Sequence, residues 1–283
     1  MTQQDPLVST QWLADHLNAP DVRIIDASWH LPTSGRNAYA EYKAAHIPGA
    51  VFFDIDDICD EESPLPHMLP HPVKFSSRMR KLGLGDGSRF VVYDTEGLFS
   101  SARVWWMLRA MGHEDVVVLD GGLPKWVAEG RKTDDLPLPP RERHFTVRYH
   151  SALVRDLEQV RDALATGREQ VVDARPPERF RGNAPEPRPG VKSGHIPGSK
   201  NVHWARLLGP DGALLPAPEL EKVFAAAGVD THSPVISSCG SGVSAAILAL
   251  ALARLGHVRT PVYDGSWAEW GSRDDLPVAT GEA

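Results

Sequence analysis

The stretch VISSCGSGVSAAILALALARLG, residues 235–256, contains the pattern that decides the fold. The short run Val235–Ser237 predicts a buried strand, and the Ala- and Leu-rich run Val243–Leu255 predicts a helix. Two glycines lie between them, where the chain must turn sharply. A strand followed directly by a helix is the building unit of a parallel sheet, and such sheets place their sites at the carboxyl ends of strands. Cys239 would lie at such an end.

The sequence repeats itself once along its length. AHIPGAVFFDID (45–56) matches GHIPGSKNVHWA (194–205), and LDGGLPKW (119–126) matches YDGSWAEW (263–270). Shorter matches between VRIIDAS and QVVDARP, and between FVVYD and PVISSC, occur in the same order and at nearly the same spacing. Several matches in register predict two homologous domains rather than a short-period solenoid.

Each half alternates short β-rich runs with helical patterns. The expected elements are strands at Ile24–Asp26, Phe90–Tyr93, Val116–Leu119, Val171–Asp173, Val235–Ser237 and Val262–Tyr263, and helices at Ala102–Met111 and Val243–Leu255. This alternation predicts an α/β fold of two tandem domains, each a mainly parallel sheet flanked by helices. We expect a first domain at 1–135, a proline-containing linker at 136–150, and a second domain at 151–283.

Composition excludes several classes of protein. The 283 residues are 42% hydrophobic and 24% charged, as in ordinary globular proteins, and the net charge of −7 argues against nucleic acid or an anionic membrane as partner. The opening MTQQDPLVSTQW predicts no signal peptide, and no apolar run reaches the length of a membrane span. Only two cysteines are present, Cys59 and Cys239, which predicts free thiols and a cytoplasmic location.

The residues around Cys239 are suited to nucleophilic chemistry. Gly240 and Gly242 permit positive φ angles, so the backbone N–H groups up to Ser244 can curl inward as an anion-binding nest at a helix N-terminus. Such a nest favours the thiolate over the thiol. The alternative is an inert buried cysteine at the end of a core strand. The first half has Asp94 and a different loop, DTEGLFSS, which favours a non-catalytic first domain and a catalytic second one.

The repeated motifs and the loop CGSGVS together resemble the two-domain rhodanese-type sulfurtransferases, from about Leu7 to Leu276. In this family, thiosulfate-specific members carry C-R-K-G-V-T, whereas the 3-mercaptopyruvate branch carries C-G-S-G-V-T. The chain is therefore similar to the 3-mercaptopyruvate sulfurtransferase branch. It departs from the branch at Ser244, which replaces a threonine and keeps the hydroxyl.

The resemblance implies specific site residues. Cys239 would be the nucleophile, and Ser241, His67 and Asp56 would form a proton relay, with His71, Asp54 and Asp57 as local alternatives. The residues implied to bind substrate are Arg179, Arg188, Gly240, Gly242, Val243 and Ser244. Arginine forks suit a carboxylate with an adjacent carbonyl. The HIPG motif occurs in both halves, which indicates a turn rather than catalysis.

The implied activity is transfer of sulfur from 3-mercaptopyruvate to a thiol, such as thioredoxin or a small thiol, or to cyanide. The route would be a Cys239 persulfide with release of pyruvate, and neither a metal nor an organic cofactor is expected. Two alternatives stay open: a thiosulfate sulfurtransferase, and a persulfide carrier without efficient turnover. A cysteine phosphatase is disfavoured, because the C-x5-R cradle would need an arginine where Ala245 stands.

Overall fold

The computed structural model describes residues 5–137, 139, 141–257 and 259–282. The chain divides into two compact units. The first contains the chain up to Asp60, together with Leu69–His150 and Gly209–Leu214. The second contains Glu61–Met68, Ser151–Leu208 and the chain from Leu215 onward. Each unit therefore takes one short segment from the opposite half of the sequence.

Each unit is built on one five-stranded sheet in which all neighbouring strands are parallel. The first sheet, in the order β1-β5-β4-β2-β3, contains β1 (Leu7–Val8), β2 (Val22–Asp26), β3 (Val51–Phe52), β4 (Arg89–Tyr93) and β5 (Val116–Leu119). The second, in the order β6-β10-β9-β7-β8, contains β6 (Val154–Arg155), β7 (Gln170–Asp173), β8 (Lys200–Asn201), β9 (Val235–Ser238) and β10 (Val262–Tyr263). The two orders are equivalent, which confirms the predicted repeat and the α/β fold.

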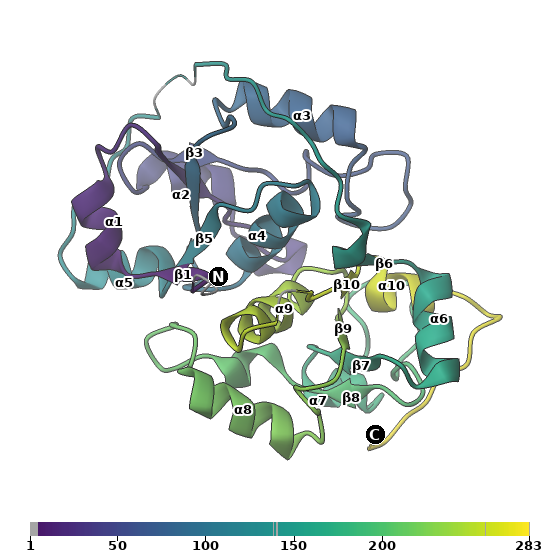
Figure 1. Cartoon of the computed structure of the whole chain (residues 1–283). Helices are drawn as coiled ribbons and strands as arrows, with labels where there is room; N and C mark the ends of the chain where they lie inside the picture. The colour runs from purple at the N-terminus through teal and green to yellow at the C-terminus, as the bar shows by residue number, and fades with distance from the viewer. Residues whose placement is uncertain (1–4, 138, 140, 258, 283) are drawn as a thin grey trace. The chain divides into compact units, whose positions relative to one another are not determined.

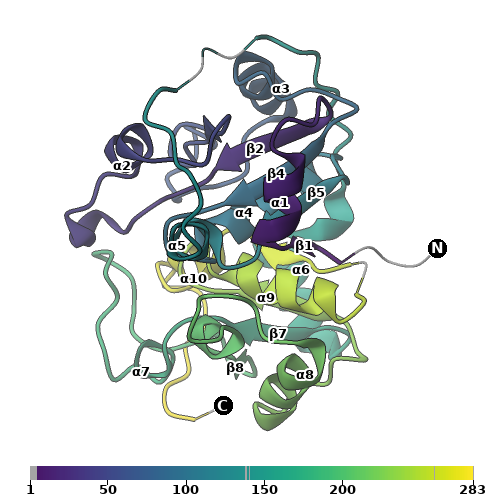
Figure 2. The same ribbon diagram turned by 90° about the vertical axis from the view of Figure 1, so that its left-hand side faces the viewer.

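Helices cover both faces of each sheet (Figure 1 and Figure 2). Those of the first unit are α1 (Thr10–His16), α2 (Ala38–Ala44), α3 (Pro72–Lys81), α4 (Ser100–Ala110) and α5 (Gly122–Ala128), with a 3₁₀ turn at Pro32–Ser34. Those of the second are α6 (Leu157–Thr166), α7 (Pro177–Phe180), α8 (Ala217–Ala226), α9 (Ala245–Arg254) and α10 (Ser266–Trp270), with 3₁₀ turns at Ser151–Leu153 and Trp204–Leu207. In the part of the chain described, no helix has the length and apolar character needed to cross a membrane.

The helix that follows Cys239, α9, is almost completely buried. Every residue of α9 from Ala245 to Ala253 is at most 4% exposed, so the helix is buried on all sides. It packs on β9 and β10. The helix begins two residues later than predicted, because Val243 and Ser244 form a turn before it. Four tryptophans of the two units, Trp105, Trp106, Trp126 and Trp270, are each at most 2% exposed.

The HIPG motifs form turns. Their glycines have φ angles of +81° at Gly49 and +79° at Gly198, a region that L-residues with a Cβ rarely adopt. The Nδ1 atom of His195 lies 2.8 Å from the carbonyl oxygen of Phe180, and the two rings stack at 3.8 Å. His46 makes the corresponding contact at 2.7 Å with the carbonyl oxygen of Tyr42. These histidines are structural, as predicted.

From the burial of His113 we predict that the folded protein loses thermal stability in acid. Its ring stacks on Phe90 at 3.9 Å, and burial lowers the pKa of His113 below its ordinary value of about 6.5. The unfolded chain therefore binds a proton more readily than the folded one, so stability is complete above the unfolded pKa and falls as the pH drops below it. We expect the melting temperature of the wild type to fall more between pH 7.5 and pH 5.5 than that of His113→Gln. If calorimetry shows the same change of melting temperature with pH in the wild type and in His113→Gln, His113 is not the source of the acid sensitivity.

Candidate active site

Cys239 directly follows β9 at the carboxyl end of the strand and is 2% exposed. The cysteine loop, Cys239–Ser244, joins β9 to α9. Gly242 has a φ angle of +77°, as expected of a glycine in a nest, but Gly240 does not adopt the left-handed region. Gly240 instead lies close to a side chain. A Cβ built at position 240 would lie 3.2 Å from Nη2 of Arg179, tighter than most Cβ contacts, so the guanidinium lies directly against the loop.

The backbone of the cysteine loop offers hydrogen-bond donors. Within the described residues, the N–H groups of Gly240, Ser241, Val243 and Ser244 donate to no acceptor. Ser241 and Val243 are also buried. Buried N–H groups are almost always paired, so unpaired ones gathered in one loop indicate a place for an anionic ligand.

The first unit shows what such a loop can hold. Asp94 directly follows β4, as Cys239 directly follows β9. The helix after each of them, α4 or α9, begins at the same spacing along the chain from that residue. Oδ1 of Asp94 accepts the N–H of Glu96 at 2.9 Å, and Oδ2 accepts those of Phe99 at 2.7 Å and Ser101 at 2.9 Å. The loop of the first unit therefore folds around its own carboxylate. In the second unit the equivalent position is occupied by sulfur.

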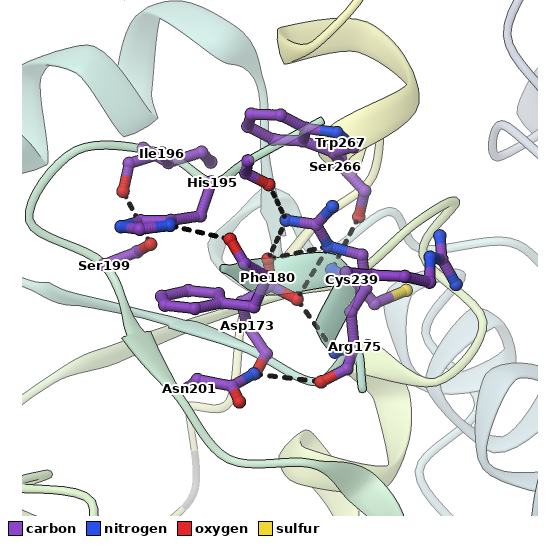
Figure 3. Close-up of polar contacts among 12 residues, drawn as sticks. Asp173, Arg175, Phe180, His195, Ile196, Ser199, Asn201, Cys239, Ser266 and Trp267 are labelled. Atoms are coloured by element: carbon purple, nitrogen blue, oxygen red, sulfur yellow. Dashed lines mark hydrogen bonds and ion pairs between the residues drawn. The ribbon is translucent and has the colours of Figure 1, made fainter. Parts of the chain in front are cut away.

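The first turn of α10 fixes the backbone of Cys239 (Figure 3). The N–H of Cys239 donates to Oγ of Ser266 at 3.2 Å, and its carbonyl oxygen accepts the N–H of Trp267 at 2.9 Å. The carbonyl oxygen of Gly240 accepts from Ala268 at 2.9 Å. These bonds hold the start of the loop rigidly against a second element of the same unit.

A buried arginine lies beside this backbone (Figure 3). The side chain of Arg175 is 1% exposed, and its guanidinium donates to Asp173 at 2.7–3.2 Å and to the carbonyl oxygen of Gly194 at 2.8 Å. It also lies over the ring of Trp267, 4.5 Å from the centroid. Burial opposes the charge, but Asp173 and Glu186 hold the pKa of Arg175 above its ordinary value.

Glu186 links this buried charge to the cysteine loop. Its side chain is 4% exposed; its Oε1 accepts from Nη1 of Arg175 at 2.8 Å, and its carboxylate forms an ion pair with Arg179. The side chain of Arg179, from α7, is 23% exposed and lies against Gly240. A line of alternating charges therefore runs from the end of β7 to the loop. Sequence reasoning missed the roles of Asp173, Arg175 and Glu186, although the triplet Asp-Ala-Arg at the end of a buried strand was a visible signal.

The other predicted site residues are distributed between the two units. Arg188 is half-buried and His67, with a φ angle of +60°, is 7% exposed; both belong to the second unit with Cys239. Asp56 belongs to the first unit, is exposed, and accepts the indole N–H of Trp29 at 2.9 Å.

The local alternatives have structural partners of their own. Asp57 pairs with Arg78 at 2.7 Å, Asp54 accepts the N–H of Asp56 at 2.9 Å, and His71 accepts the N–H of Val73 at the start of α3. No group of three or more His, Cys, Asp or Glu side chains suited to a metal ion occurs among the described residues.

Comparison with known proteins defines the family. The model of the rhodanese-like domain matches residues 9–129 and 156–273. The 3-mercaptopyruvate sulfurtransferase of Escherichia coli K12 is 44% identical over 96% of both chains. The thiosulfate/3-mercaptopyruvate sulfurtransferase 1 of Arabidopsis thaliana is 42% identical over all of this chain and 80% of the relative. The crystal structure of SseA from E. coli, a 3-mercaptopyruvate sulfotransferase, superposes with a TM-score of 0.86 at 41% identity, over 93% of this chain and 99% of that one.

The chain belongs to the rhodanese-like family and carries the domain in two tandem copies. The predicted family, fold and enzyme class, a sulfurtransferase, are thereby confirmed.

Because the ion pair between Arg175 and Asp173 is buried, we predict that breaking it lowers the free energy of unfolding. Arg175→Met would leave the carboxylate of Asp173, itself 1% exposed, without its partner, and an uncompensated buried charge costs about 3–5 kcal/mol. We expect that loss in the free energy of unfolding, measured with urea. The matched control is Arg161→Met, which breaks an exposed pair with Glu158 and should cost less than about 1 kcal/mol. Equal costs would show that the buried pair is unimportant.

Proposed function

We propose that this protein transfers sulfur from 3-mercaptopyruvate to a thiol or to cyanide through a persulfide on Cys239. The observation that carries the proposal is the neutral Gly240–Ser241 pair beside the thiol, with the guanidinium of Arg179 lying against Gly240. A carboxylate-bearing donor needs a cation at one end and free room around the sulfur. The names of the E. coli and A. thaliana relatives support the same donor.

The first half-reaction forms the persulfide. The Cys239 thiolate attacks the sulfur of 3-mercaptopyruvate, an S–S bond forms, and the C–S bond breaks. The bonding pair passes to the carbon, so pyruvate leaves as its enolate and then takes up a proton. In this proposal Arg179 and Arg188 hold the substrate carboxylate and stabilise the charge that develops on the carbonyl oxygen. The free N–H groups of the cysteine loop stabilise anionic sulfur, as the first unit's loop does for the carboxylate of Asp94.

The second half-reaction returns the enzyme to its starting state. An acceptor thiolate or cyanide attacks the outer sulfur, and the electron pair of the S–S bond returns to Cys239. We propose thioredoxin or a small thiol as the physiological acceptor and the cytoplasm as the location. The two free cysteines fit such a reducing compartment. Ser241, His67 and Asp56 are the proposed proton relay, in which the imidazole accepts and returns a proton through the serine hydroxyl.

Thiosulfate is the second candidate donor, because the name of the A. thaliana relative includes it beside 3-mercaptopyruvate. It is a small dianion, for which cations within the loop itself would be advantageous. The cysteine loop contains none. We therefore place 3-mercaptopyruvate first.

Donor-dependent product release distinguishes the candidates. We expect rapid pyruvate formation from 3-mercaptopyruvate with a thiol acceptor, slower turnover of thiosulfate, and no turnover by Cys239→Ser, because a hydroxyl cannot form the persulfide. The matched control is Cys59→Ser, which removes the other thiol and should keep full activity. A preference for thiosulfate would replace the donor assignment. A gain of one sulfur atom in mass without turnover would identify a carrier instead.

Arginine substitutions near the loop test substrate binding. Arg179→Gln removes a charge-assisted contact to the donor carboxylate and should raise KM for 3-mercaptopyruvate roughly 10- to 100-fold. Arg181→Gln is the matched control, because Arg181 pairs instead with Glu178 and Glu282. Its KM should equal that of the wild type. If both variants change KM equally, Arg179 has no specific role in holding the donor.

A further inference from the structure

A second concave site lies in the second unit, away from Cys239. It has a volume of about 540 Å³. Glu169, Pro234 and Pro261 of its lining each directly precede a strand, β7, β9 and β10 respectively. The pocket therefore lies at the amino ends of these strands, whereas Cys239 follows the carboxyl end of β9. The strand alone separates the two ends by about 13 Å.

Positive groups of the lining are not all neutralised. Arg155 is paired with Glu169 at 2.8 Å. Arg168 and Arg259 also line the pocket, and in the described part of the chain neither guanidinium has a hydrogen-bond or ion-pair partner. In a chain with a net charge of −7, two unpaired guanidinium groups facing one pocket are a local reversal of charge.

Two imidazoles add further donors to the same pocket. His232 and His257 both line it, and burial, followed by the charge of nearby His232, lowers the pKa of His257. Besides the paired Glu169, the acidic residue of the lining is Asp162, at its α6 side. A bound anion would be attracted by the two unpaired guanidinium groups and would accept hydrogen bonds from the imidazole N–H groups, which is a direct source of binding free energy.

We propose that this pocket binds the phosphate group of a small molecule. Planar guanidinium forks and imidazole N–H groups match the oxygens of a tetrahedral oxyanion. The volume exceeds what a free oxyanion fills and falls within the range of small-molecule sites, and Ala163, Pro234 and Pro261 provide an apolar wall for an organic part. The site is separate from the sulfur-transfer chemistry, so the two can be tested independently.

Histidine resonances report binding at this site. In the full-length protein at constant ionic strength, titration with inorganic phosphate and with adenosine 5′-monophosphate should shift the ring protons of His232 and His257 saturably, and adenosine should not. Arg168→Gln combined with Arg259→Gln should weaken both interactions by about tenfold or more per guanidinium removed. Tighter binding of the nucleotide than of phosphate identifies a phosphorylated small molecule as the ligand class. Equal affinities identify free phosphate.

A matched double variant controls for net charge. Arg161→Gln with Lys222→Gln also removes two cations, but each is paired with a glutamate on its own helix. It should bind phosphate as the wild type does. Both double variants should keep their melting temperature and their sulfur-transfer activity, which shows that they fold. Absence of saturable shifts at His232 and His257, or unchanged affinity in Arg168→Gln/Arg259→Gln, overturns the proposal without touching the proposed function.

Discussion

The guanidinium of Arg175, buried against Asp173, is the interaction on which the candidate active site depends. Removing both charges from water is costly, and the cost is offset only when geometry and hydrogen bonding are complete. Here three acceptor groups and one aromatic face surround the cation. From this point one connection runs through Glu186 to Arg179, and another runs through Trp267 to the backbone of Cys239. The buried guanidinium of Arg175 therefore helps to position both the backbone of Cys239 and the side chain of Arg179.

The first unit shows the same position without the arginine. Asp26 ends β2 as Asp173 ends β7, and both accept a backbone N–H two residues later, at 2.9 and 2.8 Å. The first unit has Ser28 where the second has Arg175. Asp26 has no guanidinium partner of this kind, and burial is the main reason why its pKa is raised. The duplicated scaffold thus keeps a carboxyl group at this point, and in the second unit alone it forms an ion pair with a guanidinium two residues later.

Local patterns in the sequence predicted much of the fold. Short runs of β-branched residues were sufficient for the three central strands of each sheet, because such a signal lies within a few consecutive residues. The two-residue edge strands β1, β3, β6 and β8 were not predicted, since they are too short to show a pattern. The position of Cys239 at a strand end followed from the same reasoning. The role of Glu186 could not be predicted, since it depends on an ion pair between a loop and the end of a strand. The close approach of Arg179 to Gly240, and the assignment of Glu61–Met68 to the second unit, depend equally on contacts between distant segments.

The carboxylate of Asp94, enclosed by its own loop, limits how easily one loop could be changed into the other by substitution. The side chain of Asp94 accepts hydrogen bonds from three backbone N–H groups of its own loop. The loop of the first unit therefore needs no bound ligand to pair these donors. Replacing Asp94 by cysteine would lose those bonds, and the first unit would still have Ser28 where the second has Arg175. Converting the first loop into a copy of the second therefore requires at least two coordinated substitutions, and the first of them removes three hydrogen bonds by itself. The two loops are thus separated by an unfavourable intermediate sequence.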